Sequence, residues 1–149
     1  MSIQLRTASS GDLALVHAIR RDAILGIATG MARREAQAWA DKRSPEFYAE
    51  RLAAGYVVIA GFRGDDIGWG SSADDRITGL YVRSSLAGRG VGRALLFELE
   101  ACIRKRGHAY ARLDSSPNAV GFYVRLGYVQ AGLPGGDGAV PMKKNLLAG

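Results

Sequence analysis

Residues 80–96 read LYVRSSLAGRGVGRALL. An apolar triplet that ends a strand is followed by a short polar turn, by Gly88, Gly90 and Gly92, and by an amphipathic helix. Glycine tolerates positive φ and lets a ligand approach the main chain closely, and the first amides of a helix have no partner within it. The stretch therefore predicts a strand, a loop and a helix whose backbone N–H groups bind a phosphate or pyrophosphate.

Two well-known phosphate loops do not fit this stretch. The nucleoside-triphosphate loop requires a Gly-Lys-Ser/Thr ending, which is missing. The dinucleotide loop requires Gly-x-Gly-x-x-Gly, but the third position is Arg93 when counted from Gly88 and Leu95 when counted from Gly90. The glycines therefore belong to another kind of phosphate loop.

The pattern instead resembles the acetyl-coenzyme A loop of the GNAT superfamily of N-acetyltransferases. Leu80–Val82 and Gly88–Arg93 match that loop in order and spacing, with Ala87 where the family usually has Gln or Arg. Residues 116–128, SPNAVGFYVRLGY, resemble the family's later motif, a short helix that carries Phe-Tyr and ends in Leu-Gly-Phe/Tyr. The two motifs cover roughly residues 77–129, about a third of the chain.

The resemblance implies an α/β fold with a mixed central sheet and helices on both faces. The strands at residues 77–82 and 109–114 would splay apart in its centre. The implied activity is transfer of an acetyl group from acetyl-CoA to an amine of a small molecule, peptide or protein. A sensor that binds acyl-CoA, or a transferase of another acyl group, is the alternative on the same fold. The assembly state, a homodimer included, stays open.

The same resemblance implies roles for individual residues. Backbone groups of the phosphate loop would hold the pyrophosphate: Gly88, Arg89, Gly90, Val91, Gly92 and Arg93. The pantetheine arm would lie against Leu80, Tyr81, Val82, Asn118, Ala119 and Phe122. Tyr123 matches the family tyrosine that protonates the departing thiolate, and a core aromatic beside Phe122 is its alternative role. Gly79 is expected either to permit a β-bulge or to serve packing.

The general base is not evident from the sequence. Relatives often place Glu or Asp two to four residues before the position of Leu80, but residues 76–78 are Arg-Ile-Thr. Asp74, Asp75, Asp114 or water alone remain candidates. No metal site is expected.

The acceptor site is expected to come from the N-terminal helices and the loop around residue 30. Its candidate side chains are Arg20, Arg21, Asp22, Trp39, Tyr48 and Trp69. Two tryptophans and several arginines would suit an aromatic or anionic acceptor. Core packing is an equally good role for the tryptophans.

Length and composition narrow the class of protein. The 149 residues, 48% hydrophobic and 23% charged, predict one globular domain over residues 1–149. The net charge is +6, but the basic residues are dispersed and no nucleic-acid module accompanies them. No apolar run approaches the ~18 residues of a membrane span, and the N-terminus lacks a signal-peptide layout. A cytoplasmic enzyme without a membrane partner is expected.

Hydrophobic periodicity predicts alternating strands and helices. Expected strands cover residues 3–7, 56–62, 67–70, 77–82, 109–114, 128–131 and 139–146. Expected helices follow residues 9–12 and cover residues 34–42, 46–53, 90–106 and 119–126. Residues 63–66 are expected to form a hairpin loop and residues 71–75 a polar turn.

Overall fold

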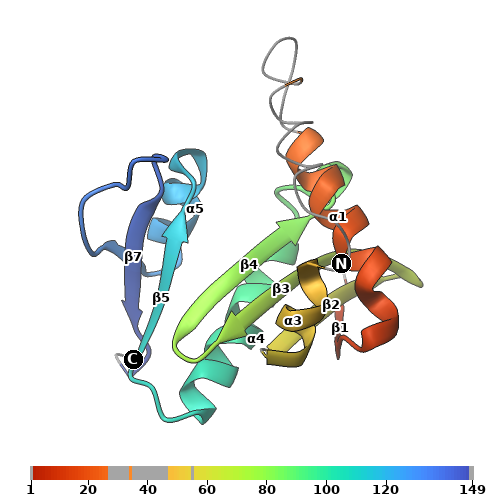
Figure 1. The fold of residues 1–149 in the computed structure, drawn as a ribbon, viewed down its shortest axis with the longest axis horizontal. Coiled ribbons are helices and arrows are strands. Elements are labelled where there is room, and N and C mark those ends of the chain that lie inside the picture. The colour runs from red at the N-terminus through yellow and green to blue at the C-terminus, as the bar shows by residue number, and fades with distance from the viewer. Residues whose placement is uncertain (1, 27–33, 35–46, 55, 148–149) are drawn as a thin grey trace.

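The computed structural model describes residues 2–26, 34, 47–54 and 56–147 (Figure 1). The helix expected over residues 34–42, with its Trp39, lies outside the described residues apart from residue 34. The expected helix start at residues 44–46 also lies outside them.

The described strands form one mixed seven-stranded sheet in the order β1-β2-β3-β4-β5-β7-β6. Neighbours are antiparallel except β4 and β5, which are parallel. The strands are β1 (Gln4–Thr7), β2 (Tyr56–Phe62), β3 (Asp65–Ala73), β4 (Arg76–Val82), β5 (Tyr110–Ser115), β6 (Val129–Gln130) and β7 (Val140–Asn145).

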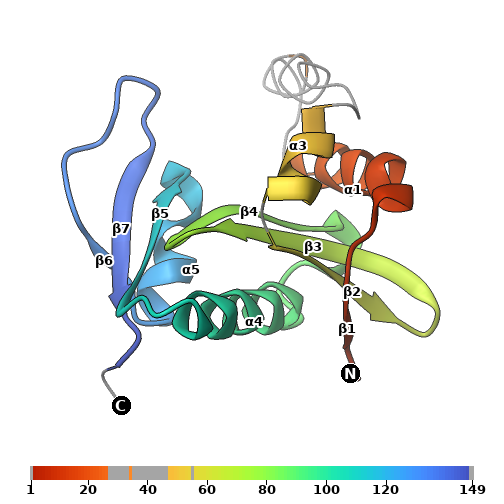
Figure 2. The same ribbon diagram turned by 60° about the horizontal axis from the view of Figure 1, so that its bottom comes forward.

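Helices cover both faces of this sheet, as expected (Figure 2). On one face lie α1 (Leu13–Leu25), which follows a 3₁₀ turn at Ser10–Asp12, and α3 (Phe47–Ala54). On the other lie α4 (Val91–Lys105) and the short α5 (Val120–Arg125). Strand β2 is apolar on both sides because Val57 and Ile59 pack toward α1, whereas Val58 and Ala60 pack toward α4.

The hairpin of β2 and β3 is tighter and longer than predicted. Only Arg63 and Gly64 form its turn, both with positive φ (54° and 84°), as a two-residue hairpin turn requires. The polar turn expected over residues 71–75 is confined to Asp74 and Asp75, because Ser71 and Ser72 continue β3 and are buried. The Ser71 hydroxyl lies 2.7 Å from the Thr78 hydroxyl, and Ser72 Oγ accepts a hydrogen bond from an arginine of α4's end. Paired hydroxyls allow serine to occupy a buried strand.

Strands β4 and β5 meet only at their beginnings. Arg76 pairs with Arg112, the Arg112 amide donates to the Asp75 carbonyl at 2.9 Å, and the strands then diverge (Figure 1). The register of β4 against β3 shifts between Ser71 and Ser72, which leaves Thr78 as the extra residue of a β-bulge. The expected splay and bulge are therefore both present.

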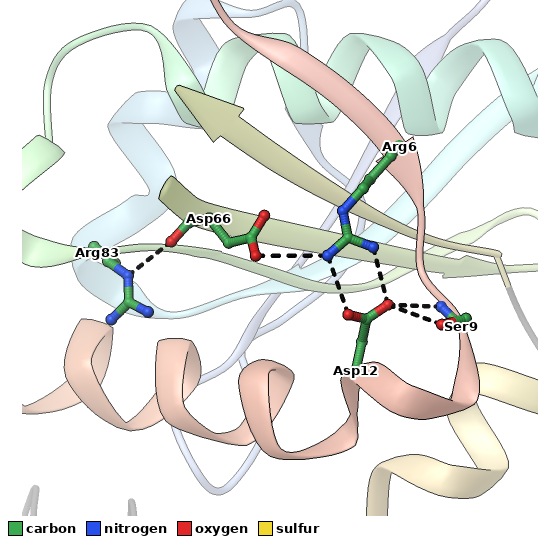
Figure 3. A network of polar contacts seen from close by, with 5 residues as sticks. All are labelled: Arg6, Ser9, Asp12, Asp66 and Arg83. Atoms are coloured by element: carbon green, nitrogen blue, oxygen red, sulfur yellow. Dashed lines mark hydrogen bonds and ion pairs between the residues drawn. The ribbon is translucent and has the colours of Figure 1, made fainter. Parts of the chain in front are cut away.

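A polar network fastens the α1 layer to the edge of the sheet (Figure 3). Both terminal nitrogens of Arg6 donate to the Asp12 carboxylate at 3.0 Å, and one of them lies 3.5 Å from Asp66. The Ser9 amide also donates to Asp12, at 2.8 Å. Arg83, just after β4, donates from Nε to the Asp66 carbonyl. The network thus joins β1, the start of α1, β3 and the segment that leads to α4.

The first prediction concerns Gly79 in β4. A Cβ at this position would lie 2.8 Å from Trp69 Cζ3 and 3.0 Å from Ser71 Oγ. Gly79→Ala should therefore lower the free energy of unfolding by about 1–3 kcal/mol through overpacking. Gly61→Ala is the control, since its Cβ would meet only ordinary contacts from 3.5 Å. Equal urea midpoints for the two variants would contradict this packing role.

The second prediction concerns Asp12. Hydrogen bonds from Arg6 lower the pKa of Asp12 from 3.8 to about 2. Because the folded-state pKa is depressed, the stabilisation is present above pH 4 and is lost as the pH falls toward 2. Asp12→Asn should lower the free energy of unfolding by about 1 kcal/mol at pH 7. This value is smaller than the pKa shift alone implies, because Arg6 is half exposed and solvent screens the pair.

Urea denaturation at a series of pH values checks this prediction. The stability difference between the native protein and Asp12→Asn should shrink as the pH falls below 4. The exposed Asp65→Asn is the control. A difference that stays constant from pH 7 down to pH 3 would rule out an electrostatic origin.

Candidate functional site

A cleft of about 560 Å³ lies where β4 and β5 diverge. We call it the β4–β5 cleft. The residues that line it come from the end of α1, from β4, from the end of β5 and the turn into α5, and from the β6–β7 loop. They are Ala23, Ile24, Ile77, Thr78, Gly79, Leu80, Tyr81, Val82, Leu113, Asp114, Ser115, Ser116, Pro117, Asn118, Ala119, Tyr123, Asp137 and Ala139.

One wall of the cleft is an edge of backbone. The Arg83 amide donates to the Ile67 carbonyl in β3 at 2.9 Å. Because backbone groups alternate sides along an antiparallel strand, Leu80 and Val82 direct their N–H and C=O groups away from β3 and toward β5. The described β4–β5 pairing is confined to Arg76 and Arg112. These groups therefore face the cleft without a strand partner.

The glycine loop follows β4 and leads into α4. Gly88 and Gly90 have φ values of 76° and 85°, and a Cβ on either would meet open space. Gly90 is the N-cap of α4 and brings no side chain to the cap, so the amides of Val91, Gly92 and Arg93 have no partner inside the helix. The loop is exposed and does not line the cleft itself. Its amides lie at the positive end of α4, where negative charge is favoured.

Gly92, in the first turn of α4, lies close to a side chain of α5. A Cβ on Gly92 would lie 3.3 Å from Phe122 Cζ and 3.8 Å from Val82 Cγ2. Phe122 thus packs against the first turn of α4 and does not line the cleft, in contrast to its neighbours Asn118 and Ala119. Phe122 helps to hold the loop beside the cleft.

Tyr123 is both a core residue and part of the cleft wall. The residue is 9% exposed, and its ring makes edge contacts with Phe122 and Tyr128. Burial, with a smaller contribution from Tyr81, raises its pKa from 10 to about 12. The phenol therefore stays protonated and remains a hydrogen-bond donor through neutral and mildly alkaline pH.

The three candidate bases occupy different places. Asp114 lines the cleft, but Arg76 lies 2.9 Å from its carboxylate. Asp75 pairs with Arg112 at 3.2 Å, and the exposed Asp74 lies 3.2 Å from His108 Nε2, both outside the cleft lining. Only Asp114 of the three is thus in reach of a molecule in the cleft.

Several cleft residues were not predicted. Ala23 and Ile24 reach it from the end of α1, and Asp137 reaches it from the β6–β7 loop. Asp137 Oδ1 accepts a hydrogen bond from the Ala139 amide at 3.0 Å, which closes the loop. Ala23 follows Leu13, Val16 and Ile19 at helical spacing in the sequence, but nothing local indicates which cavity it faces.

The described residues that were expected at the acceptor site do not line the cleft. Trp69 is 2% exposed and donates from Nε1 to the Val16 carbonyl at 2.9 Å, and Tyr48 packs edge-on against it. Both are core residues. The Asp22 carboxylate accepts hydrogen bonds from the Ser84 amide and hydroxyl, so it anchors the segment after β4. Arg20 remains buried beside Tyr81.

Two further features concern metals and membranes. Across residues 2–26, 34, 47–54 and 56–147, no group of three or more His, Cys, Asp or Glu side chains is placed to hold a metal ion. None of the helices in that part of the chain has the length and apolarity needed to cross a membrane.

Comparisons with known proteins match this architecture. The chain is similar to a GCN5-related N-acetyltransferase structure from Rhodopseudomonas palustris, with 26% identity and a TM-score of 0.81 over 97% of this chain and 96% of that one. It is also similar to the PaiA N-acetyltransferase of Thermoplasma acidophilum in complex with coenzyme A, with 23% identity and a TM-score of 0.81 over 97% and 99%.

A third similar structure is N-acetylglutamate synthase from Neisseria gonorrhoeae, complexed with coenzyme A and N-acetyl-glutamate. The identity is 20% and the TM-score 0.75 over 99% of this chain and 36% of that one. No curated protein sequence matches the chain. The family model described as the acetyltransferase (GNAT) domain matches residues 11–146. With this match over most of its length, the chain belongs to the GNAT acetyltransferase family.

Proposed function

We propose that this protein is an acetyl-CoA-dependent N-acetyltransferase that acetylates an amine of a small molecule, peptide or protein. The observation that carries the proposal is the β4–β5 cleft, where strand backbone faces a cavity and the same strand leads into a glycine loop at a helix N-terminus. Family membership and the coenzyme A complexes among the similar structures support it.

The cleft fits an extended, amide-containing arm. The pantetheine arm of coenzyme A carries peptide-like amides, which can pair with the strand edge at Leu80 and Val82 as an added strand would. Leu80, Tyr81, Val82, Asn118 and Ala119 then flank the arm. The bound thioester supplies an acyl group that is activated toward attack by an amine.

The phosphate loop fits the other end of the same molecule. Unpartnered amides and the positive end of α4 favour a pyrophosphate, and the open space at Gly88 and Gly90 lets phosphate oxygens approach the backbone. The side chains of Arg89 and Arg93 are exposed and add positive charge. Because the cradle is made of main chain, it does not depend on the side chain missing at Ala87.

Tyr123 is proposed to donate a hydrogen bond to the departing thiolate. With a pKa of about 12, its phenol is always protonated at neutral pH. A free thiol has a pKa of about 8.5, so full proton transfer from Tyr123 is uphill. We therefore assign Tyr123 a stabilising hydrogen bond that strengthens as negative charge develops on sulfur.

The acceptor amine is proposed to arrive unprotonated or to lose its proton to water near Asp114. An α-amine, with a pKa of about 8, has a sizeable neutral fraction at neutral pH, whereas a lysine amine at about 10.4 does not. The Asp114 carboxylate already pairs with Arg76 at 2.9 Å, so one of its oxygens is occupied. The site therefore suits α-amines better than lysine side chains.

A two-part assay tests the proposed function. Coenzyme A or acetyl-CoA should raise the melting temperature, because ligand that binds only the native state stabilises it. Free thiol release from acetyl-CoA should then appear with at least one member of an amine panel. Stabilisation without thiol release from any amine would favour an acyl-CoA sensor, and the absence of stabilisation at millimolar coenzyme A would exclude both functions.

A third prediction addresses the phosphate loop. Gly90→Val should weaken coenzyme A binding by at least tenfold, because valine is strained at a φ of 85° at the N-cap of α4. Ala87→Arg is the control and should change affinity much less, since position 87 lies before the cradle. Calorimetric titration with coenzyme A measures both, and similar small effects would contradict a backbone cradle.

A fourth prediction addresses Tyr123. Tyr123→Phe should lower kcat about tenfold to a hundredfold, the low end of the range for acid–base groups, while the coenzyme A affinity stays within twofold. The ring contacts with Phe122 and Tyr128 are kept, so the melting temperature should hardly move.

Phe122→Leu is the matched control for the fourth prediction. It alters the packing beneath the loop and should affect coenzyme A affinity more than kcat. An unchanged kcat for Tyr123→Phe, with the chemical step rate-limiting, would remove Tyr123 from the reaction.

A further inference from the structure

The end of α1 contacts the segment that leads from β4 to the glycine loop. The Asp22 carboxylate accepts a hydrogen bond from the Ser84 amide at 2.9 Å, and the Ser84 hydroxyl lies 3.4 Å from the same oxygen. Ser84 begins the 3₁₀ turn Ser84–Leu86, and Arg83 before it brings no side-chain cap to that turn. The first amides of a helical turn lack partners within it, so a side chain of α1 serves as the cap of this turn.

A second contact, at Gly26, brings the same two segments together. Gly26 ends α1 with a φ of −68°, which residues of every type adopt, so its backbone conformation does not require glycine. A Cβ at this position, however, would overlap Ser84 Cβ and lie 2.5 Å from Ser84 Oγ. The absence of a side chain at Gly26 is therefore what lets the end of α1 approach Ser84 so closely.

Few polar contacts hold the segment before α4. Among the described residues, the hydrogen bonds that residues 83–89 make to other elements come from Arg83 and Ser84. Arg83 bonds to β3, and Ser84 bonds to α1. Residues 87–90, which include the start of the glycine loop, are exposed. The direction in which the chain enters that loop thus depends on Asp22.

The same end of α1 also borders the β4–β5 cleft. Ala23 and Ile24, which directly follow Asp22, line the cleft. A single ligand that fills the cleft and reaches the glycine loop binds best when the two are already held at the right separation, because ordering them on binding costs free energy. Helix α1 contacts both and is placed to set that separation.

We infer that Asp22 is a positioning residue for coenzyme A: through Ser84, which Gly26 allows to approach, it sets the glycine loop for the pyrophosphate. The inference rests on the proposed binding of acetyl-CoA and adds to its determinants a residue that does not line the cleft. Asp22 acts here as a hydrogen-bond acceptor, because its negative charge by itself disfavours an anionic cofactor. An asparagine oxygen can accept the same bond and should replace it.

Calorimetric titration with coenzyme A tests the inference. Asp22→Ala should weaken binding about tenfold, the size of one hydrogen bond, although the loss of a negative charge alone would favour an anion. Asp22→Asn should bind as tightly as the native protein or more tightly. Glu50→Ala, which removes an exposed acid of α3, is the control and should keep the native affinity. Native affinity in Asp22→Ala, or equal weakening in Asp22→Asn, would overturn the inference.

Gly26→Ala tests the same contact from the opposite side and leaves Asp22 in place. Alanine favours helix more than glycine does, so α1 should be retained while the added Cβ displaces Ser84. Coenzyme A binding should weaken in this variant but not in Gly11→Ala, whose Cβ would meet only Ser9 Oγ at 3.8 Å. Native affinity in Gly26→Ala would overturn the inference, and this variant decides it if Asp22→Ala does not fold.

Backbone amide resonances give a readout that a purely structural role would not move. Without coenzyme A, the signals of Gly88 and Gly90 should shift in Asp22→Ala and Gly26→Ala and should stay near their native positions in Asp22→Asn. Signals of β6, at the far edge of the sheet, should not shift in any variant. A lower melting temperature with unmoved loop signals and native coenzyme A affinity would show that Asp22 only stabilises the fold, and would overturn the inference.

The two proposals fail in different ways. A native protein that binds no coenzyme A would contradict the proposed function, and the loop resonances would then decide the positioning by Asp22 alone. Coenzyme A binding that is equally tight in the native protein, Asp22→Ala and Gly26→Ala would leave the proposed function intact and refute the positioning role.

Discussion

The structure depends on one unsatisfied edge of backbone. A central strand normally exhausts its N–H and C=O groups on two neighbours. In the described part of the chain, β4 has a full partner only in β3, and its pairing with β5 is confined to Arg76 and Arg112. The groups at Leu80 and Val82 consequently require a ligand or water. A peptide-like arm that lies along this edge would meet the requirement, which is why we propose coenzyme A as its ligand.

Other parts of the fold keep this edge open and in place. The missing side chain at Gly79 makes room for Trp69, which α1 holds through the Val16 carbonyl. Asp22 ties the end of α1 to Ser84, and Phe122 packs against Gly92 at the start of α4. Helices on opposite faces of the sheet thus fix the strand edge and the glycine loop relative to one another.

The sequence predicted those features of the fold that a local sequence pattern determines. The bounds of β2 and the start of α4 follow from an apolar run and from the glycines before Val91. The burial of Ser71 and Ser72 was missed because their hydroxyls are satisfied by residues that only the folded chain brings near. The same limit applies to the site: the place of Asp137 and the engagement of Asp114 by Arg76 are set by tertiary contacts.

Amide hydrogen exchange, resolved by residue with and without coenzyme A, tests the central claim most directly. If the open edge of β4 and the first turn of α4 bind the cofactor, coenzyme A should slow exchange at Leu80, Val82 and the amides of residues 91–93. Amides that already pair within the sheet, such as that of Arg83, should change much less. Saturating coenzyme A that left these β4 and α4 amides unprotected, and protected another surface, would contradict the account.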